Sequence, residues 1–563
     1  MDSILILGGG TMQLPALRAA RRLGLTLYVV DADSHAPGAL LADHFEPIDL
    51  KEKEVIAEFA RGIPNLRAVF TAGTDFSLSV AHVSEKLGLP GIPEEVARNA
   101  SEKGLMRERF RAEGVPSPRF TVIDPEDDAA DAARKAGESV GYPGVIKPVD
   151  NMGARGVRTV RRTDELISAV GEARRFAREG RVIYEEEIRG REFSIDGLVY
   201  RGKLHITGIA DRHIYFPPYF VEMGHTLPAT LGKREEDILR NAFAAGVEAL
   251  GIDNGGAKGD LFLREDGSIA VGEIAARLSG GYMSGWTYPF ATGVDLTEAG
   301  IRLALGEDPA PHLSPRKADT SAERAIISIP GIVETVEGED RLRELPGVRE
   351  LFLRVERGSR VAPPRNNVEK CGNIIVTGGS REEAVSRAAV ALQSVTVRLR
   401  PAVEMTDDYL FGAEPQKSWA PYPWLLLDAR ESTAGDPAPG EFTFPKLLSW
   451  KQDSLEAGAL LVPENTVDTM LRRLPKMIRR GTDRPTADPG HHWSGSTLEE
   501  SLEAVGNRGI LREHGRGTTL GAYIVRRAVS LGGLQGVVYI WDTLKDPFAE
   551  RSLKRWCLER NVV

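Results

Sequence analysis

Residues 258–281 read KGDLFLREDGSIAVGEIAARLSGG, and this stretch decides the fold. The EDG triplet at 265–267 separates two apolar runs, a pattern that predicts a β-hairpin. Asp260 interrupts the first run and Glu273 interrupts the second. Two inward-facing carboxylates on neighbouring strands repel each other unless a cation lies between them. Arg277 and a glycine-containing loop follow the second strand, so charged groups gather at one end of the hairpin.

The two carboxylates predict a magnesium site. Oxygen ligands without His or Cys suit Mg²⁺, which takes one or two carboxylates and completes its shell with phosphate oxygens and water. The alternative is a pair of strand-edge carboxylates in water. If a metal binds, Arg277 is placed to hold anionic oxygens that the metal leaves uncovered.

Further cations are expected around a metal–phosphate site. Lys147 ends the apolar run GVIKP, where a buried lysine needs an anionic partner. In the following DNMGARGV, Gly153 and Gly156 allow backbone N–H groups to wrap phosphate oxygens, and Arg155 adds a charge. Lys103 opens a helix in SEKGLMRERF and is interpreted either as a second phosphate-binding cation or as a solvated helix lysine.

Composition narrows the class of protein. The chain has 563 residues, enough for three or four structural units, and a net charge of -9, which argues against non-specific nucleic-acid binding. Its 2 cysteines provide no disulfide framework. The apolar run ILIL near the N-terminus is too short for a signal peptide or a membrane helix. We therefore expect a cytoplasmic protein without a membrane partner.

Residues 1–31 predict a strand, a glycine-rich turn, a helix and a second strand. Gly8 and Gly10 resemble the start of a dinucleotide fingerprint, but Gln13 stands where the third glycine belongs. A tight turn is therefore favoured over an NAD site, and a dehydrogenase is the weakest alternative. The loop Thr71–Asp75 follows another strand, at an edge where open α/β sheets bind ligands. Near Ser380, SREE predicts a capping box at a helix start.

Five motifs together resemble the ATP-grasp superfamily, and they occur in the family's order. They are SEKGLMRERF, VIKPVDNMGARGV, VIYEEEIRGREFSIDG, GDLFL and VGEIAARLSGG. The resemblance covers residues 1–412 and is closest to the carboxylate–amine ligases of the biotin carboxylase and L-amino-acid ligase branch. It implies a multidomain α/β and α+β fold. The expected parts are a Rossmann-like domain at 1–98, an ATP-grasp domain at 99–310 with a mobile lid at about 118–190, a closing subdomain at 311–412 and an extra domain at 413–563.

The resemblance also implies roles for individual residues. Lys103 and Lys147 look like the phosphate-binding lysines, and residues 151–156, with Gly153, Arg155 and Gly156, look like the phosphate lid. Glu185, Glu186 and Ile188 fall in the hinge, where the Glu186 carbonyl and the Ile188 N–H resemble the groups that read adenine. Glu192 resembles the ribose-binding carboxylate. Asp260 and Glu273 resemble the Mg²⁺ (or Mn²⁺) ligands, and Arg277 resembles the arginine that steadies the acyl phosphate. Lys147 and Arg277 carry the catalytic roles. Ala275 departs from the family, which often has Asn there as another metal ligand.

These roles imply an ATP-dependent ligase that activates a small carboxylate as an acyl phosphate and joins it to an amine. Candidate substrate residues are Arg212, Glu222, His225, Ser279 and Gly280, with a surface loop as the alternative for Arg212, Glu222 and His225. Two further functions stay open: ATP-dependent carboxylation through carboxyphosphate, and a non-catalytic nucleotide-binding regulatory protein. The expected partners are small-molecule carboxylates and amines, with no nucleic acid, and a homodimer is one possible assembly.

The tail at 413–563 lies beyond the resemblance. It holds six of the 7 tryptophans, which indicates a core of its own or a packing surface. A basic stretch at 471–481 is interpreted as a solvated helix face, and GHHW at 490–493 as a polar loop. Residues 534–561 predict a strand followed by a helix, and thus a small α/β domain.

Overall fold

The computed structural model describes residues 1–216, residues 218–411 and single positions between 528 and 552. It divides into two compact units. The first contains Met1–Glu323 and Ile375–Ala384, and the second contains Arg324–Ile374 and the chain from Val385 onwards. The division into four domains stays a prediction. The α/β and α+β character of the chain is confirmed by the elements of both units.

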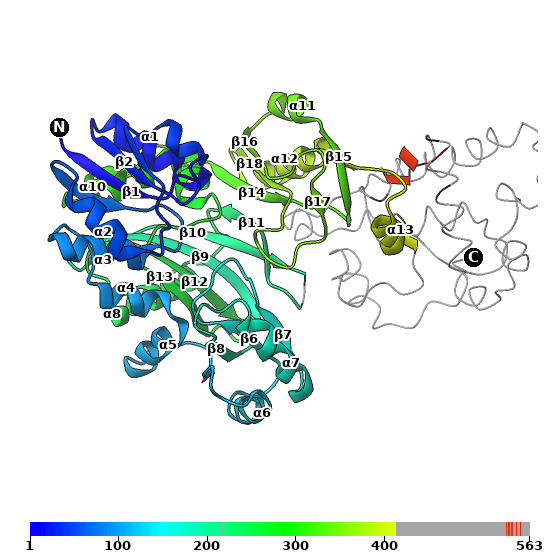
Figure 1. Ribbon diagram of the computed structural model, residues 1–563, viewed down its shortest axis with the longest axis horizontal. Coiled ribbons are helices and arrows are strands. Elements are labelled where there is room, and N and C mark those ends of the chain that lie inside the picture. The colour runs from blue at the N-terminus through cyan, green and yellow to red at the C-terminus, as the bar shows by residue number, and fades with distance from the viewer. Residues whose placement is uncertain are drawn as a thin grey trace, which may run out of the picture. The chain divides into compact units, whose positions relative to one another are not determined.

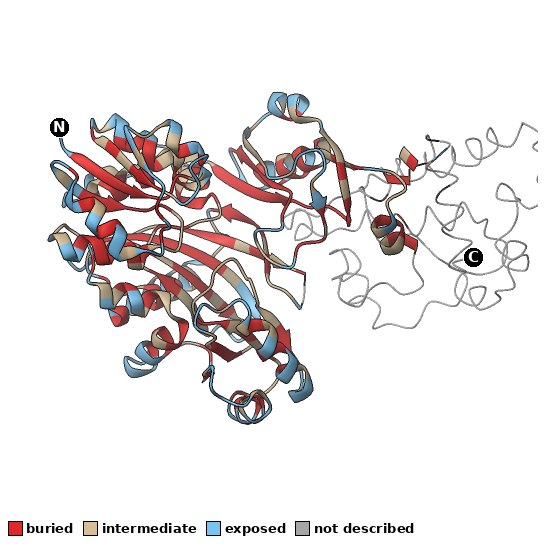
Figure 2. Cartoon of the chain, viewed as in Figure 1, coloured by how far each residue is buried: buried red, intermediate tan, exposed pale blue. Residues whose placement is uncertain are grey.

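The N-terminal part of the first unit is a parallel sheet in the order β3-β2-β1-β4. Its strands are β1 (Ser3–Leu7), β2 (Thr26–Val30), β3 (His44–Glu46) and β4 (Leu66–Phe70), connected by helices α1 (Leu14–Arg22) and α2 (Lys53–Arg61) and followed by α3 (Ser77–Leu87). Strand β1 is buried along its whole length (Figure 2). A strand covered on both faces needs a continuous apolar run, which SILIL provides.

Gln13 explains the imperfect fingerprint after β1. Its side chain lies against Gly8 and donates to the Ala72 carbonyl at 2.7 Å, while the Ala72 N–H donates back to it at 2.8 Å. Gln13 thus ties the turn after β1 to the loop after β4. This arrangement supports the interpretation as a tight turn, because the side chain fills the space beside Gly8.

Five antiparallel strands form the middle of the first unit and belong to a larger sheet. Its strands follow the order β13-β12-β9-β10-β11, and β14 and β18 come next. They are β9 (Gly190–Tyr200), β10 (Lys203–Tyr215), β11 (Val221–Leu227), β12 (Gly255–Arg264), β13 (Ile269–Ala275), β14 (Thr320–Ile326) and β18 (Gly372–Gly378). Helices α4 (Glu94–Ser101), α5 (Lys103–Ala112) and α8 (Lys233–Leu250) pack on it, and α9 (Tyr288–Thr292) and α10 (Leu296–Ala304) follow β13. Figure 1 shows these long strands beside the N-terminal sheet.

The predicted hairpin at 255–281 is confirmed. β12 and β13 pair antiparallel around the EDG turn, and Asp260 stands directly opposite Glu273. The pairing shifts register between Asp260 and Leu261, which marks a bulge. Bulges re-aim side chains and are frequent beside functional sites.

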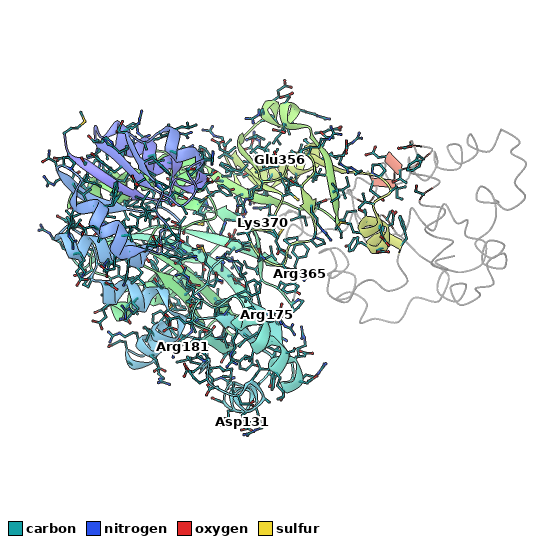
Figure 3. All side chains as sticks on the ribbon, viewed as in Figure 1. Asp131, Arg175, Arg181, Glu356, Arg365 and Lys370 are labelled. Carbon is teal, nitrogen blue, oxygen red and sulfur yellow. The ribbon has the colours of Figure 1, made fainter. Side chains whose placement is uncertain are left out.

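A smaller sheet, in the order β5-β8-β6-β7, corresponds to the predicted lid. Its elements are β5 (Phe120–Ile123), α6 (Ala129–Val140), β6 (Gly144–Pro148), β7 (Arg158–Val160), α7 (Thr163–Arg174) and β8 (Val182–Glu186). Arg181 lies beside this sheet (Figure 3) and pairs with Asp124 at 2.7 Å. It also reaches within 4.0 Å of Glu102, which caps α5. Glu102 is therefore the N-cap residue of this helix, which begins at Lys103.

The second unit contains β15 (Gly331–Glu337), β17 (Arg360–Val361) and β19 (Thr396–Leu399) in one sheet, with β16 (Val348–Leu353) and helices α11 (Glu339–Glu344) and α13 (Glu404–Phe411). Helix α12 (Arg381–Ser394) begins in the first unit and continues in the second. Ser380 accepts the Glu383 N–H at 3.2 Å, and the Glu383 side chain accepts the Gly379 N–H at 2.6 Å. The capping interaction predicted from SREE is therefore present.

Most of the predictions for the tail lie outside the described residues, including all six of its tryptophans, the basic stretch and GHHW. At the described positions Tyr539, Ile540 and Thr543 the backbone is helical, so the strand predicted there is wrong. The Thr543 hydroxyl donates to the Tyr539 carbonyl at 2.8 Å, a bond along one helix face. Tyr539 is buried, and its hydroxyl donates to Asp407 at 2.6 Å. Burial of this face stabilises a helix despite the β-branched residues that favour a strand.

Candidate functional site

The centre of the site is the pair Asp260 and Glu273. The Asp260 side chain is nearly buried; one carboxylate oxygen contacts Lys258 and lies 3.3 Å from Arg212. The other oxygen, Oδ1, is buried without a hydrogen-bond partner. A buried acceptor without a partner is costly unless a ligand satisfies it.

This geometry fits a divalent cation. Burial tends to raise the pKa of Glu273, but the charge of Lys103, with smaller contributions from Lys258, Lys147 and Arg277, lowers that pKa to about 2. Glu273 is therefore ionised and ready to bind metal at neutral pH. Among the described residues no cluster of three or more His, Cys, Asp or Glu is arranged for a metal. Two carboxylates leave the rest of the coordination shell to phosphate and water, which is how Mg²⁺ usually binds.

Lys103 belongs to this site rather than to solvent. Its side chain is only 9% exposed, and its Nζ lies 3.9 Å from Glu273 Oε1 and donates to the Asn151 carbonyl at 3.0 Å. The interpretation as a solvated helix lysine is therefore wrong. Its position at the first turn of α5, next to the backbone of the 151–156 loop, brings a cation to the predicted phosphate position.

Lys147 on β6 pairs with Glu185, a partner that the sequence motif alone did not identify. Its Nζ lies 2.5 Å from Glu185 Oε2, and Glu185 Oε1 lies 2.8 Å from Arg107 Nε. Burial opposes ionisation of Glu185, but Arg107 and Lys147 outweigh it and lower the pKa of Glu185. Arg107 is a positioning residue that sequence reasoning missed. Its spacing of four from Lys103, on the same helix face, was the available signal.

The glycine-rich loop after β6 has the backbone that its sequence predicts. Gly153, Ala154 and Gly156 have φ values of 69, 60 and 71°, in the left-handed region. A Cβ at Gly156 would lie 2.8 Å from the Phe176 ring, so this position also needs glycine for space. Arg155 donates to the Met152 carbonyl at 3.1 Å within the same loop. Successive residues of this kind form the concave backbone that binds anions.

The predicted adenine hinge follows β8. The Glu186 carboxylate pairs with Arg119 at 2.7 Å and with Arg264 at 2.6 Å. These ion pairs engage the side chain only, and the predicted contact with adenine uses the backbone carbonyl. Ile188 lies in the short connection between β8 and β9. Glu192 follows on β9, where burial raises its pKa to about 7 despite the attraction of Arg212.

Arg212 on β10 connects three acids. It lies 3.3 Å from Glu192, 3.0 Å from Glu222 and 3.3 Å from Asp260. Burial alone would lower the pKa of Arg212, but the three carboxylates raise it, so the guanidinium stays charged. Arg212 therefore joins the predicted metal ligand Asp260 to the predicted ribose and substrate residues.

Glu222 and His225 lie on β11, and their interpretation as a surface loop is wrong. His225 is almost fully buried, with Nδ1 3.0 Å from Glu323 Oε2 and Nε2 3.6 Å from Glu222 Oε2. The segment reads VEMGHTL, whose mixed polarity hides a strand that is covered on both faces. The structure thus brings the candidate substrate residues Arg212, Glu222 and His225 together.

Arg277 follows β13 and faces the N-terminal sheet. Its Nε lies 3.7 Å from Asp75 Oδ1, on the loop that follows β4. The Ser279 N–H donates to buried Asp196 at 2.9 Å, so this N–H is not available to a substrate carboxylate and Gly280 remains the predicted backbone donor. At Gly281, with φ 57°, a Cβ would lie 2.8 Å from Glu222, which explains the glycine. Asp196 and Asp75 were not assigned roles from sequence.

Two family models match the chain. Residues 140–285 match the ATP-grasp domain, and residues 324–400 match the L-amino acid ligase C-terminal domain 2. The chain contains an ATP-grasp domain. Its matched range holds Lys147, the glycine-rich loop, the predicted hinge, both acids of the predicted metal site and Arg277. The resemblance expected from the five motifs is confirmed.

Known proteins are similar to this chain at modest identity. Protein y4rH of Sinorhizobium fredii is 26% identical over 402 residues, covering 69% of this chain and 81% of its own length. Carnosine synthase 1 of Gallus gallus is 25% identical, covering 70% of this chain but only 45% of its own. The crystal structure of L-amino acid ligase from Bacillus licheniformis has a TM-score of 0.62 and 24% identity, covering 71% of this chain and 99% of that one. This likeness shows a common fold. Among the described residues, no helix combines the length and apolarity needed to cross a bilayer.

Proposed function

We propose that this protein is an ATP-dependent carboxylate–amine ligase. It activates a small carboxylate as an acyl phosphate, joins it to an amine and releases ADP and phosphate. The observation that carries the proposal is the cross-strand pair Asp260 and Glu273, flanked by Lys103 on one side and followed by Arg277. This set offers oxygen ligands for a metal and cations for a transferring phosphoryl group.

The chemistry balances without a further reactant. A carboxylate oxygen of the donor attacks the γ-phosphorus of ATP, the bond to the β-phosphate oxygen breaks, and ADP leaves. The amine nitrogen then attacks the acyl carbon, phosphate leaves with the C–O bond electrons, and the nitrogen loses a proton. A magnesium ion held by Asp260 and Glu273 would neutralise phosphate charge during the first step.

The protein's own groups position the reactants and neutralise charge. Lys147 and Lys103 are placed to bind phosphate oxygens, and Arg277 is placed to bind the acyl phosphate and the tetrahedral intermediate. Glu185 and Arg107 fix the Lys147 ammonium in place. The glycine-rich loop at 151–156 keeps water from the acyl phosphate, which would otherwise hydrolyse.

The largely buried acid Glu222 on β11 favours an amino acid or a similar compound as one substrate. Glu222 provides a carboxylate for an ammonium group, and His225 and Arg212 hold Glu222 in place. The Gly280 N–H is the proposed contact for a substrate carboxylate.

The two alternatives make different predictions. Carboxylation through carboxyphosphate requires bicarbonate alone to support ADP release. A regulatory protein with no activity is disfavoured by the presence of Lys147, Asp260, Glu273 and Arg277 together. The cytoplasm as location and a homodimer as assembly are further expectations of this proposal.

The experiment is to measure ADP and phosphate release with a panel of amino acids and small carboxylates, alone and in pairs. The ligase predicts release that requires two organic substrates together and an amide or peptide product in equal amount. Release with bicarbonate alone would favour the carboxylase. No release with any pair, in protein that binds ATP, would contradict catalysis.

A further inference from the structure

Four residues at the end of the hairpin form two adjacent cross-strand pairs on one face of the sheet. Asp260 on β12 stands opposite Glu273 on β13, and Lys258 stands opposite Ala275. Side chains two residues apart on a strand point to the same face, so all four belong to one site. Ala275 offers no ligand atom, and its cross-strand partner is a cation.

Lys258 is largely buried in this site and contacts one of its acids. Its side chain is 13% exposed, and its Nζ contacts Asp260 Oδ2, the oxygen that also faces Arg212. Its other cross-strand neighbour is Asp196, which is fully buried. The charge of Lys258 also helps to lower the pKa of Glu273.

Charge then limits how many metal ions the site can hold. One divalent ion can bind between Glu273 and the unpartnered Oδ1 of Asp260. A second ion on the Ala275 side would lack a ligand there and would meet the Lys258 ammonium at close range, where like charges repel strongly because the site is poorly solvated. An ammonium can donate hydrogen bonds to phosphate oxygens, so it can supply part of the positive charge that a second ion would bring to the phosphates.

We propose that the Lys258 ammonium occupies the place of a second divalent cation, so that this nucleotide site holds one divalent ion per chain. The inference rests on the proposed function, because it assumes that a metal–nucleotide complex binds between Asp260 and Glu273. It makes Lys258 a further nucleotide-binding residue, which acts through its charge and its contact with Asp260.

Counting bound Mn²⁺ tests the inference without measuring turnover. Electron paramagnetic resonance gives the free Mn²⁺ in titrations of the full chain with the non-hydrolysable ATP analogue AMP-PNP. Wild type should bind one Mn²⁺ per chain. The double variant Lys258→Met with Ala275→Asn removes the ammonium and adds a ligand, so it should bind two.

Two single variants serve as controls. Ala275→Asn alone keeps the ammonium and should bind one Mn²⁺. Lys233→Met removes a surface lysine that pairs with Asp237 on α8 and should also bind one. Circular dichroism checks that each variant is folded. If the double variant does not fold, Lys258→Gln alone takes its place and should bind a second Mn²⁺ that wild type does not.

The outcomes separate the inference from the proposed function. Two Mn²⁺ ions in wild type, or one in the double variant, would overturn the role of Lys258 and leave the ligase proposal standing. No bound Mn²⁺ in wild type with AMP-PNP present would overturn both, because the nucleotide–metal site itself would be missing.

Discussion

Asp75 Oδ1 lies 3.7 Å from Arg277 Nε and connects the N-terminal sheet to the end of the β12–β13 hairpin. Both side chains are largely buried, at 16% and 12% exposure. Gly73 on the same loop approaches the backbone of Ser279 and Gly280 so closely that a Cβ there would lie 3.0 Å from the Ser279 carbonyl. The loop after β4 therefore fixes the position of the arginine that we assign to the acyl phosphate.

Replacing Arg277 tests its assignment to catalysis. Arg277→Ala should lower kcat by roughly a hundredfold or more, corresponding to about 3 kcal/mol, because one preorganised cation is lost from the transition state. The Kd for ATP should change little, since we assign nucleotide binding to the lysines and the hinge. Steady-state ADP release and nucleotide titration measure the two quantities. Arg302→Ala on α10 is the matched control and should resemble wild type; turnover of Arg277→Ala at the wild-type rate would remove this residue from the mechanism.

Replacing Asp75 tests the connection between the two sheets. Asp75→Asn keeps the size of the side chain but removes the charge that holds Arg277, and we expect kcat to fall about tenfold. The KM for ATP should stay within about twofold, since Asp75 has no assigned role in nucleotide binding. Asp75→Glu should recover part of the loss. An unchanged kcat in Asp75→Asn would show that Arg277 is held well enough without this contact.

The buried group of Lys147, Glu185 and Arg107 should be a large determinant of stability. Glu185→Leu leaves two buried cations without their acid, and loss of one partner of a buried ion pair typically costs about 3–5 kcal/mol. Urea unfolding of the nucleotide-free protein measures the free energy of unfolding. The control Glu236→Gln breaks a half-exposed pair with Arg240 and should change that free energy only slightly. Equal effects of the two variants would contradict the burial argument.

The hairpin and the cap of α12 were predictable because short-range signals specify them. EDG sets the turn that brings Asp260 opposite Glu273, and Ser380 with Glu383 marks a helix start. Lys103 was ambiguous for the opposite reason. Its burial depends on Glu273, far away in the sequence, and no local pattern reports such a neighbour.

The same limit explains the residues that were missed. Arg107 on α5 acquires its role through Glu185 on β8, and Asp75 acquires its role through Arg277. The polar residues around His225 were compatible with a loop. In the structure they lie on a buried strand, where a partner such as Glu323 satisfies the His225 side chain. The roles of these residues depend on partners that are distant in the sequence, and the sequence alone does not identify those partners.

The raised pKa of Glu192 predicts a pH-dependent stability. Burial raises the pKa from its ordinary value of 4.5 to about 7, so between these values the folded protein holds a proton that the unfolded chain has lost. Stability should therefore fall as the pH rises through this window and change no further above about 7. Glu192→Gln cannot ionise, so its stability relative to wild type should increase by about 1–3 kcal/mol between pH 5 and pH 8. Urea unfolding without nucleotide measures this difference, and a difference that does not depend on pH would contradict the assignment.

Transfer of isotope from the carboxylate to phosphate tests the central claim most directly. A carboxylate substrate found in the panel is labelled with ¹⁸O and incubated with the enzyme, ATP, Mg²⁺ and the amine, and the released phosphate is analysed by mass spectrometry. Activation as an acyl phosphate predicts that each phosphate carries one oxygen from the labelled carboxylate. Unlabelled phosphate, formed at the same rate as product, would contradict the account.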